Sequence, residues 1–254
     1  MTTPKEMNPN MLENQVVLIT GAARGMGEAV ATRCRERGAH LVLVDRDPQV
    51  KELAALLDAT AVIGDVTDST LAHTTVEEAV RSHGLVTGLV NVAGIHAHGG
   101  VADVTDEDWD RVLAVNLTGP MVWMRAAVPA IVAAGGGSVV NFGSIAGSHG
   151  RPDCAAYVAS KSGLLGLTRS VARDYGHAHV RVNTLSPGTI DTPMFREHEA
   201  KGGSNRNDHL PRIPLGRLGT TDDVANVTAF LLSDESAYVS GLDVVVDGGR
   251  VSWT

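Results

Sequence analysis

The stretch Val16-Val-Leu-Ile-Thr-Gly-Ala-Ala-Arg-Gly-Met-Gly27 decides the fold. Its first five residues are apolar or β-branched, which is typical of a strand that is buried on both faces. Three glycines follow, and the pattern then predicts a helix that runs to Gly38. A strand, a glycine turn and a helix in this order favour a dinucleotide site, because a helix N-terminus attracts a pyrophosphate. The spacing is G-x-x-x-G-x-G rather than G-x-G-x-x-G, so a plain turn is the alternative.

Strands and helices alternate along the rest of the chain. Apolar and β-branched runs predict further strands at residues 40–45, 60–64, 85–91, 138–144, 180–185 and 242–246. Helical patterns lie between them, including a long helix that begins after Thr105 and reaches about Ala134. This alternation favours an α/β fold in which helices cover both faces of a parallel sheet.

Polar side chains stand where three of the expected strands end. Asp45, Asp65 and Asn91 occupy these positions, and ligands of parallel sheets bind beyond the carboxyl ends of the strands. Asp45 follows the last glycine of the loop at nearly the spacing of about 20 residues that a ribose-binding carboxylate shows. Its charge repels a 2′-phosphate, which favours NAD over NADP. Arg24 and Arg46 keep NADP open as the alternative, because either could bind that phosphate.

Composition excludes several classes of partner. The chain carries a formal net charge of −8, with 43% hydrophobic and 20% charged residues. The acidic balance argues against nucleic acid or an anionic membrane surface, and no apolar run reaches the roughly 18–20 residues of a membrane span. We expect a flexible leader over residues 1–11 and one catalytic domain over 12–254. Cys34 and Cys154 show no metal or redox spacing, so we expect reduced thiols, a cytoplasmic protein and no metal site.

Tyr157 and Lys161 are the first candidate catalytic residues. They lie four positions apart on an expected helix and therefore share one face. The ordinary pKa of tyrosine is about 10, and a nearby cation favours the phenolate form. The two side chains could act as an acid/base pair, whereas the alternative is a surface tyrosine and lysine on an ordinary helix.

Two more polar residues are candidates by position. Ser144 ends an expected strand and faces Tyr157 across a loop at residues 145–153, unless it only caps the next turn. Pro120 lies inside the long helix and cannot donate a hydrogen bond to the carbonyl of Asn116. We predict a kink that leaves this carbonyl free to hold a water, and a simple kink with a solvated Asn116 is the alternative.

The segment 193–213 is the longest one without strong periodicity. We predict a lid over the substrate pocket, with a solvated surface loop as the alternative. The other candidate pocket residues are His96, His98, Ile145, His149 and Arg151. Their side chains could suit a polar or anionic substrate, although a position at the rim of the pocket is the favoured interpretation.

Taken together, these motifs resemble the short-chain dehydrogenase/reductase family over about residues 12–250. The family's glycine motif T-G-x-x-x-G-x-G falls on residues 20–27, and its N-N-A-G motif falls on Asn91-Val92-Ala93-Gly94. Val92 replaces the usual asparagine, which affects the packing of the strand end more than catalysis. The family's catalytic residues and its Pro-Gly motif fall on Asn116, Ser144, Tyr157, Lys161 and Pro187-Gly188.

The resemblance implies a Rossmann-type doubly wound sheet of about seven parallel strands that binds NAD(P). The pyrophosphate would lie on the Gly21–Gly27 loop, the adenosine ribose on Asp45, and the nicotinamide ribose on Lys161. The implied cofactor-binding residues are Gly21, Arg24, Gly25, Met26, Gly27, Asp45, Arg46, Asp65, Val66, Asn91, Ala93, Gly94, Tyr157, Lys161, Pro187, Gly188, Ile190 and Thr192. A homotetramer or homodimer through the helices around Asn116 and Tyr157 and the C-terminal strand is also implied.

The implied activity is hydride transfer between a secondary alcohol or ketone and NAD. Tyr157 would act as general acid/base, Ser144 would donate a hydrogen bond to the substrate oxygen, and Asn116 would hold a water that links Lys161 to solvent. A cyclic or bulky alcohol is the expected substrate. An NADPH-dependent ketone or 3-oxoacyl reductase is the runner-up, and a non-catalytic cofactor-binding scaffold or sensor is less favoured because all four catalytic positions are filled.

Overall fold

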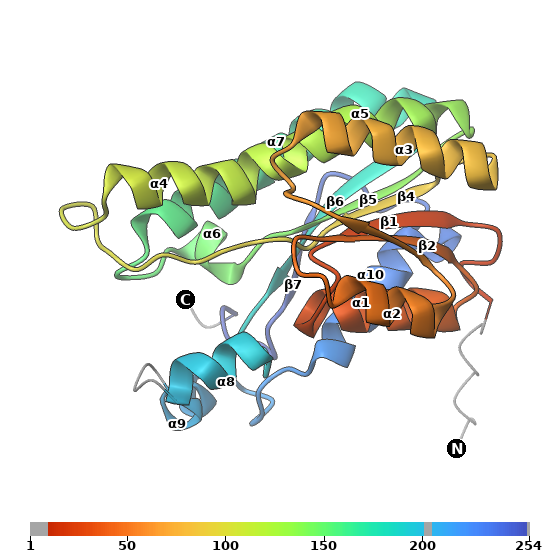
Figure 1. Cartoon of the computed structure of the whole chain (residues 1–254). Coiled ribbons are helices and arrows are strands. Elements are labelled where there is room, and N and C mark those ends of the chain that lie inside the picture. The colour runs from red at the N-terminus through yellow and green to blue at the C-terminus, as the bar shows by residue number, and fades with distance from the viewer. Residues whose placement is uncertain (1–9, 201–204, 253–254) are drawn as a thin grey trace, which may run out of the picture.

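The computed structural model describes residues 10–200 and 205–252. Its centre is a seven-stranded parallel sheet with the order β3-β2-β1-β4-β5-β6-β7 (Figure 1). The strands are β1 Val16–Thr20, β2 His40–Asp45, β3 Thr60–Ile63, β4 Gly88–Asn91, β5 Gly137–Phe142, β6 Val180–Pro187 and β7 Asp243–Val246. The predicted Rossmann-type α/β fold is confirmed, and each expected strand is present within a few residues of its predicted ends.

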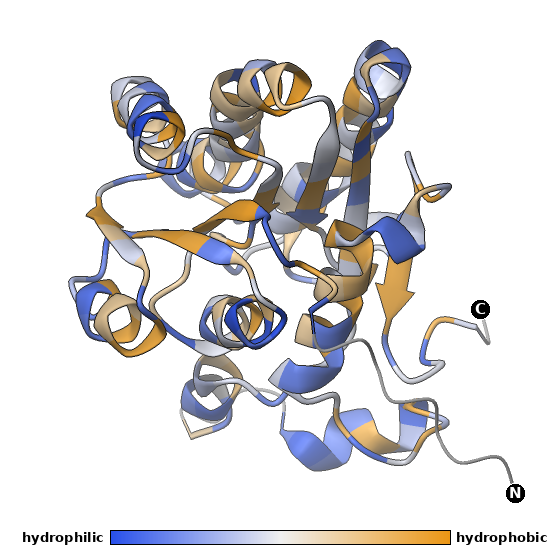
Figure 2. Cartoon of the chain, turned by 90° about the vertical axis from the view of Figure 1, so that its right-hand side faces the viewer, coloured by the Kyte–Doolittle hydropathy of each residue, from blue (hydrophilic) through white to orange (hydrophobic). Residues whose placement is uncertain are grey.

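Helices cover both faces of the sheet, and each face has its own hydrophobic core. The helices α1 Gly25–Glu36, α2 Val50–Leu57 and α10 Thr221–Leu232 form one layer, and α3 Ser69–His83, α4 Asp106–Leu113, α5 Gly119–Ala133 and α7 Ala155–Tyr175 form the other (Figure 1). Val17 and Ile19 of β1 pack into the first core, whereas Val16 and Leu18 pack into the second. This alternation follows from the two-residue period of a strand. The strands are mostly hydrophobic, while the helices turn hydrophilic sides outward (Figure 2).

The long helix that was predicted from Thr105 to about Ala134 is interrupted. Thr105 caps its first turn by accepting a hydrogen bond from the amide of Asp108, as the sequence indicated. A π-helical turn, η1 Ala114–Thr118, then separates α4 from α5. Pro120 lies at the start of α5, where its missing N–H breaks the regular ladder. The π-helix is rare and appears mostly as a single turn inside an α-helix, often at a functional site.

Two segments that were expected to be loops contain short helices. One is α6 Ile145–His149. Within residues 193–213 the structure has α8 Pro193–Ala200, α9 Arg206–His209 and the 3-10 turn η3 Leu210–Arg212. The remaining short turns are η2 Gly176–Ala178 and η4 Asp234–Ser236. These helices lack the regular spacing of apolar residues from which a helix is predicted. Local caps stabilise them instead, such as the capping box of Asn205 and Asp208 at the start of α9.

The ends of the predicted units are only partly covered by the structure. Residues 1–9 of the predicted leader and residues 201–204 of the predicted lid lie outside the described residues. Met11 packs against the first hydrophobic core, and Leu12 is fully buried in it. Met11, the last residue of the predicted leader, therefore packs against the domain. In the ranges 10–200 and 205–252, no helix combines the length and the apolarity that crossing a bilayer requires.

Candidate active site

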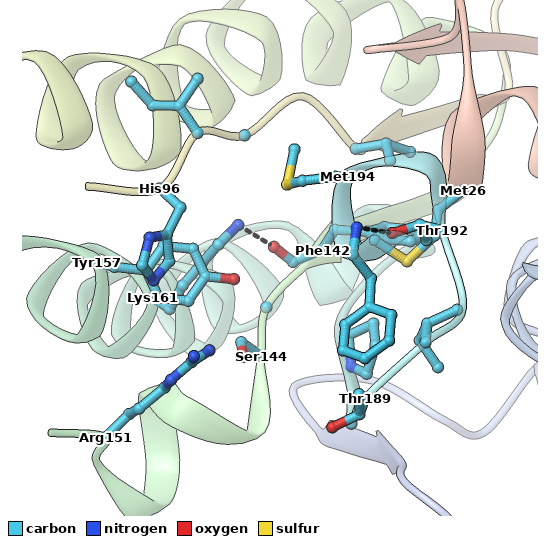
Figure 3. Close-up of a pocket in the computed structure, with 18 of the residues that line it drawn as sticks. Met26, His96, Phe142, Ser144, Arg151, Tyr157, Lys161, Thr189, Thr192 and Met194 are labelled. Carbon is cyan, nitrogen blue, oxygen red and sulfur yellow. Dashed lines mark hydrogen bonds between the residues drawn. The ribbon is translucent and has the colours of Figure 1, made fainter. Parts of the chain in front are cut away.

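Most of the predicted site residues meet at the carboxyl edge of the sheet. A cavity of about 520 Å³ opens there between the end of β5, the start of α7 and the segment after β6 (Figure 3). Of the predicted residues it is lined by Met26, Gly94, Ser144, Tyr157, Lys161, Pro187, Gly188, Ile190, Thr192, His96, His98 and Arg151. Met194, Phe195 and His209, which belong to the predicted lid, also line it.

A second cavity, of about 240 Å³, lies beside the glycine loop. It is lined by Gly21, Arg24, Gly25, Met26, Gly27, Asp45, Arg46, Asp65, Val66, Ala93, Gly94 and Thr192, together with Val92 and other neighbours. Met26, Gly94 and Thr192 line both cavities. The two spaces therefore adjoin, and an elongated ligand on the glycine loop can reach the wall that holds Tyr157.

Tyr157 and Lys161 occupy the first two turns of α7. The Lys161 Nζ lies 5.8 Å from the centroid of the Tyr157 ring, and it donates a hydrogen bond of 2.6 Å to the carbonyl oxygen of Phe142 (Figure 3). Ser144 reaches the same space from the start of α6, where its hydroxyl accepts from the amide of Ala146 at 3.2 Å. The Ser144 side chain lies near the Tyr157 phenol, where it favours the ionised form of that group. The three functional groups thus share one wall.

The electrostatic environment of this wall differs from the sequence expectation. Burial raises the pKa of Tyr157 above its ordinary value, although the nearby Ser144 side chain and the charge of Arg151 act in the opposite direction. Burial also lowers the pKa of Lys161 to about 8. The phenol therefore does not become more acidic beside the lysine in the protein alone, because removal of both groups from water outweighs the attraction of one buried ammonium.

The buried ammonium should be visible in the pH dependence of stability. Lys161 has a pKa of about 8 in the folded chain against 10.5 for a free lysine, so the unfolded chain binds the extra proton between these two pH values. Stability rises with pH wherever the unfolded state binds more protons. We expect the free energy of unfolding of the parent, relative to Lys161→Met, to increase from pH 8 to pH 10.5.

Urea unfolding of the two proteins across this pH range measures the difference. The comparison uses the slope of the free energy of unfolding against pH rather than its absolute value. In the variant the Phe142 carbonyl loses its hydrogen bond, and the resulting loss of stability does not change with pH, so it does not affect the slope. Parallel pH profiles would contradict the buried position of the Lys161 amine.

Asn116 lies in the π-helical turn and is fully buried. Its Oδ1 accepts from the amide of Ile95 at 2.8 Å, and its Nδ2 donates to the Ile95 carbonyl at 2.9 Å and to the Ser160 hydroxyl at 3.2 Å. The side chain thus fixes the segment after β4 to α7, which excludes the alternative of a solvated asparagine. The water on its main-chain carbonyl stays a prediction.

The glycine loop has the geometry that a pyrophosphate requires. Gly21 has a φ of +68°, and a Cβ on it would lie 2.6 Å from the amide nitrogen of Ala93. A Cβ on Gly27 would lie 1.9 Å from the carbonyl oxygen of Gly21. Arg24 begins α1 without a side-chain cap, so the first N–H groups of this helix are available to an anion. The residues present therefore fit a dinucleotide.

The acidic residues of the loop edge are held in place by backbone amides. Asp45 accepts from the amides of Ala23 and Asp47, each at 2.9 Å. Asp65 accepts from Thr67, and these hydrogen bonds hold the pKa of its carboxyl below the ordinary value. Both carboxylates line the smaller cavity, as expected for groups that contact a ribose and a base.

Asn91 is placed differently from the expectation. Its side chain is buried and donates to the Oδ1 of Asn141 on β5 at 2.8 Å. It lines neither of the two cavities, whereas the next residue, Val92, lines both and packs partly against the first core. The amide of Asn91 thus links β4 to β5 beneath the site, because the pleat of the strand turns this side chain inward.

Several contacts between the lining residues and their neighbours carried no sequence signal. His96 stacks against Tyr157 with ring centroids 5.0 Å apart, and its Nε2 lies 3.2 Å from the Cys154 sulfur. Thr189, His209 and Arg250 meet through hydrogen bonds although they are far apart in the sequence. Both cysteines are buried and free. Within the described residues, no group of three or more His, Cys, Asp or Glu side chains could hold a metal ion.

Comparisons with known proteins agree with this geometry. Residues 21–250 match the family described as enoyl-(acyl carrier protein) reductase. The chain is 38% identical to a 2-(S)-hydroxypropyl-CoM dehydrogenase of Xanthobacter autotrophicus, over 96% of this chain and 99% of that protein. It is 39% identical to a 3-oxoacyl-[acyl-carrier-protein] reductase of Thermotoga maritima, over 94% and 99% of the two chains. It is 36% identical to a cyclohexanol dehydrogenase of an Acinetobacter species, over 96% and 97%.

Solved structures are similar over the same length. A provisionally assigned short-chain alcohol dehydrogenase from Sinorhizobium meliloti superposes with a TM-score of 0.88 at 34% identity, covering 96% of this chain and 99% of that one. The identity and the coverage show that the described domain is similar to proteins of one family over nearly its whole length.

Proposed function

This chain belongs to the short-chain dehydrogenase/reductase family, and we propose that it interconverts a secondary alcohol and its ketone with NAD as the hydride partner. The observation that carries the proposal is the wall formed by Tyr157, Ser144 and Lys161. It lines a cavity that adjoins the glycine loop, so a carbinol carbon bound at Tyr157 can lie next to a dinucleotide that extends from that loop.

The chain's own residues handle the proton. When bound, the oxidised nicotinamide ring supplies the hydride acceptor and a positive charge. Tyr157 takes the hydroxyl proton of the alcohol on its phenolic oxygen, and in the reverse direction the same group returns it. Ser144 donates a hydrogen bond to the substrate oxygen, which strengthens as negative charge develops there.

Lys161 and Asn116 support this exchange. The Lys161 ammonium is fixed by the Phe142 carbonyl on one side of the phenol, where it attracts a phenolate more strongly than a phenol. Asn116 holds the main chain of Ile95 in place, and Ile95 lines both cavities. We propose that a water on the Asn116 carbonyl carries protons between Lys161 and solvent.

Preference for NAD rests on Asp45. Its carboxylate lies at the end of β2 in the smaller cavity, where a negative charge binds the ribose hydroxyls and repels a 2′-phosphate. Arg24 also lines this cavity, but its guanidinium pairs with Glu197 of α8 at 3.8 Å. Arg46 is the competing feature, since it would favour NADP.

We expect Asp45→Asn to shift cofactor use towards NADP. The amide keeps one acceptor oxygen for the loop but removes the charge, so the ratio of kcat/KM with NADP to that with NAD should rise roughly ten- to a hundredfold, the size of a hydrogen bond to a charged group. Initial rates with both cofactors measure it. Asp47→Asn is the matched control, because the Asp47 carboxylate accepts from the Gln49 amide and Asp47 lines neither of the two cavities. A parent enzyme that already prefers NADP would contradict the assignment.

A cyclic or otherwise bulky secondary alcohol is the proposed substrate class. The cavity of about 520 Å³ has the size of a small-molecule site, and one relative is named as a cyclohexanol dehydrogenase, which implies such a ring as its substrate.

The related 3-oxoacyl reductase supports the second candidate, a ketone or 3-oxoacyl reductase that uses NADPH. A panel of cyclic and linear secondary alcohols with NAD and with NADP, followed by absorbance of the reduced nicotinamide, separates the two. Cofactor binding without turnover of any alcohol or ketone would instead indicate a non-catalytic cofactor-binding scaffold or sensor.

Exposed apolar residues at one edge of the sheet bear on how copies of this chain could assemble. Val245 on the edge strand β7 and Leu242 just before it are exposed, as is Phe230 on α10. An apolar sheet edge of this kind favours pairing with a second copy. We propose a homodimer or homotetramer that uses this edge and the helices around Asn116 and Tyr157. A cytoplasmic location is proposed because both thiols are free.

A further inference from the structure

A third cavity, of about 1140 Å³, extends from the catalytic one. It lies between α6, the segment that contains α9 and η3, and the residues after β7. Five residues line both spaces: Ser144, Arg151, Gly188, Thr189 and His209. A substrate that places its carbinol at Tyr157 and Ser144 can therefore extend into this outer cavity.

The charged lining of the outer cavity is mainly basic. It contains Arg151, Arg212 and Arg250, which come from three separate segments. Among the described residues, Asp208 is the acidic one that lines this cavity. The Asp208 carboxylate is already engaged, because it accepts from the amide of Asn205 at 2.8 Å. This excess of positive charge stands out in a chain whose formal net charge is −8.

The three arginines have no carboxylate partner in the part of the chain that the structure describes. Among the described residues, none of them forms a salt bridge within 4.0 Å. They are also close enough to repel one another: burial first, and then the charges of Arg212 and Arg151, lower the pKa of Arg250. Asp247 acts in the opposite direction as a smaller cause, and its oxygens accept from the amides of Gly249 and Val251.

Arg250 is held in a fixed orientation. Its Nη1 donates to the Thr189 hydroxyl and to the His209 Nδ1, the latter at 2.9 Å. A guanidinium only donates, so the His209 Nδ1 accepts and the imidazole is neutral. Burial and the nearby arginines lower the pKa of His209, which is consistent with that neutral form. No other hydrogen bond of this guanidinium occurs within residues 10–200 and 205–252, so its remaining N–H groups can contact a ligand.

From this arrangement we propose that the natural substrate is a secondary alcohol or ketone with an acidic tail, and that Arg151, Arg212 and Arg250 bind the tail. The tail is a compact oxyanion such as a carboxylate, sulfonate or phosphate. Guanidinium groups bind such groups with paired, charge-assisted hydrogen bonds, and the mutual repulsion of the arginines is relieved when the anion arrives. The inference rests on the proposed function and adds its substrate class.

Two probes of the same shape test the charge preference. 4-Hydroxycyclohexanecarboxylate and its carboxamide share the ring and the carbinol but differ in charge. With NAD, we expect a kcat/KM that is at least roughly tenfold higher for the carboxylate, the size of a hydrogen bond to a charged group. The KM for the carboxylate should rise with added NaCl, while that for the carboxamide should not.

Arginine variants then locate the effect. Arg212→Gln should reduce the ratio of kcat/KM for carboxylate over carboxamide by roughly tenfold or more. Arg81→Gln is the matched control, because Arg81 is exposed on α3 and lines none of the three cavities. An equal kcat/KM for the two probes, or an unchanged ratio in Arg212→Gln, would overturn the inference and leave the proposed oxidoreductase activity intact.

A binding measurement keeps the inference separate from turnover. Calorimetric titration of cyclohexanecarboxylate, cyclohexanesulfonate and cyclohexyl phosphate into the NADH-loaded protein should show binding that is weakened in Arg212→Gln, and the ranking identifies the preferred oxyanion. If neither alcohol probe is oxidised but these anions bind in this way, the proposed ring substrate fails and the anion site stands. If none of the anions binds, the anion site fails whatever the activity.

Discussion

Tyr157→Phe is expected to lower kcat by about 10²–10⁴-fold, the usual contribution of a positioned general acid/base. The substitution removes one oxygen and leaves the ring, which packs against His96. The affinity for NADH should therefore stay near the parent value, and fluorescence titration of the bound reduced cofactor measures it. In the oxidation direction the parent rate should rise with pH, since the base must lose its proton and burial raises the pKa of Tyr157. The variant should lack this rise.

The matched control is Tyr238→Phe. Tyr238 is fully exposed and lines none of the three cavities, so its variant should keep the parent rate and the parent pH profile. A Tyr157→Phe enzyme that oxidises an alcohol at close to the parent rate would remove Tyr157 from the chemistry. A loss of NADH affinity together with the rate would point to a collapsed pocket instead.

Gly27→Ala should abolish measurable dinucleotide binding. The added methyl group would lie 1.9 Å from the carbonyl oxygen of Gly21, so either the start of α1 or the glycine loop must move. Overpacking of this kind typically costs about 1–3 kcal/mol of stability, and the displaced loop no longer offers its amides to a pyrophosphate. Thermal unfolding with and without NADH measures both effects: the variant should melt earlier and should gain nothing from the cofactor.

Gly166→Ala is the opposite control. Gly166 lies inside α7, and nothing stands within 4 Å of the position of an added Cβ. Alanine in a helix interior is more stable than glycine by roughly 1 kcal/mol, so this variant should melt at or above the parent temperature and keep the cofactor-dependent gain. Equal behaviour of the two variants would contradict the close contact between the glycine loop and α1.

The fold could be predicted from the sequence because each strand has a recognisable local pattern of its own. Each core strand is short and apolar, and β1 meets the glycine turn directly, so local pattern and global topology agree. The residues of the cofactor edge followed from the same logic, since the carboxyl ends of parallel strands lie together. Spacing and position made Asn116, Ser144, Tyr157 and Lys161 candidates, and the family resemblance assigned them catalytic roles. The structure brings Ser144, Tyr157 and Lys161 to one wall of a cavity.

What the sequence did not reveal depends on contacts between distant residues. Nothing in the spacing of Thr189, His209 and Arg250 indicates that they meet, because the contact is created by how α9 and the end of the chain fold over β6. The inward turn of Asn91 depends on its partner Asn141 in the next strand. The upward shift of the Tyr157 pKa depends on burial, which a helix pattern alone does not determine.

The two hydrogen bonds that Asp45 accepts have a consequence for protein engineering. One carboxylate oxygen holds the amide of Ala23, in the glycine loop, and the other holds the amide of Asp47. The side chain that would discriminate between the two coenzymes is therefore also a brace for the loop that carries them. Redesign or natural drift towards the phosphorylated coenzyme cannot simply delete this acid, and we expect it to proceed through residues that preserve the brace while changing the charge.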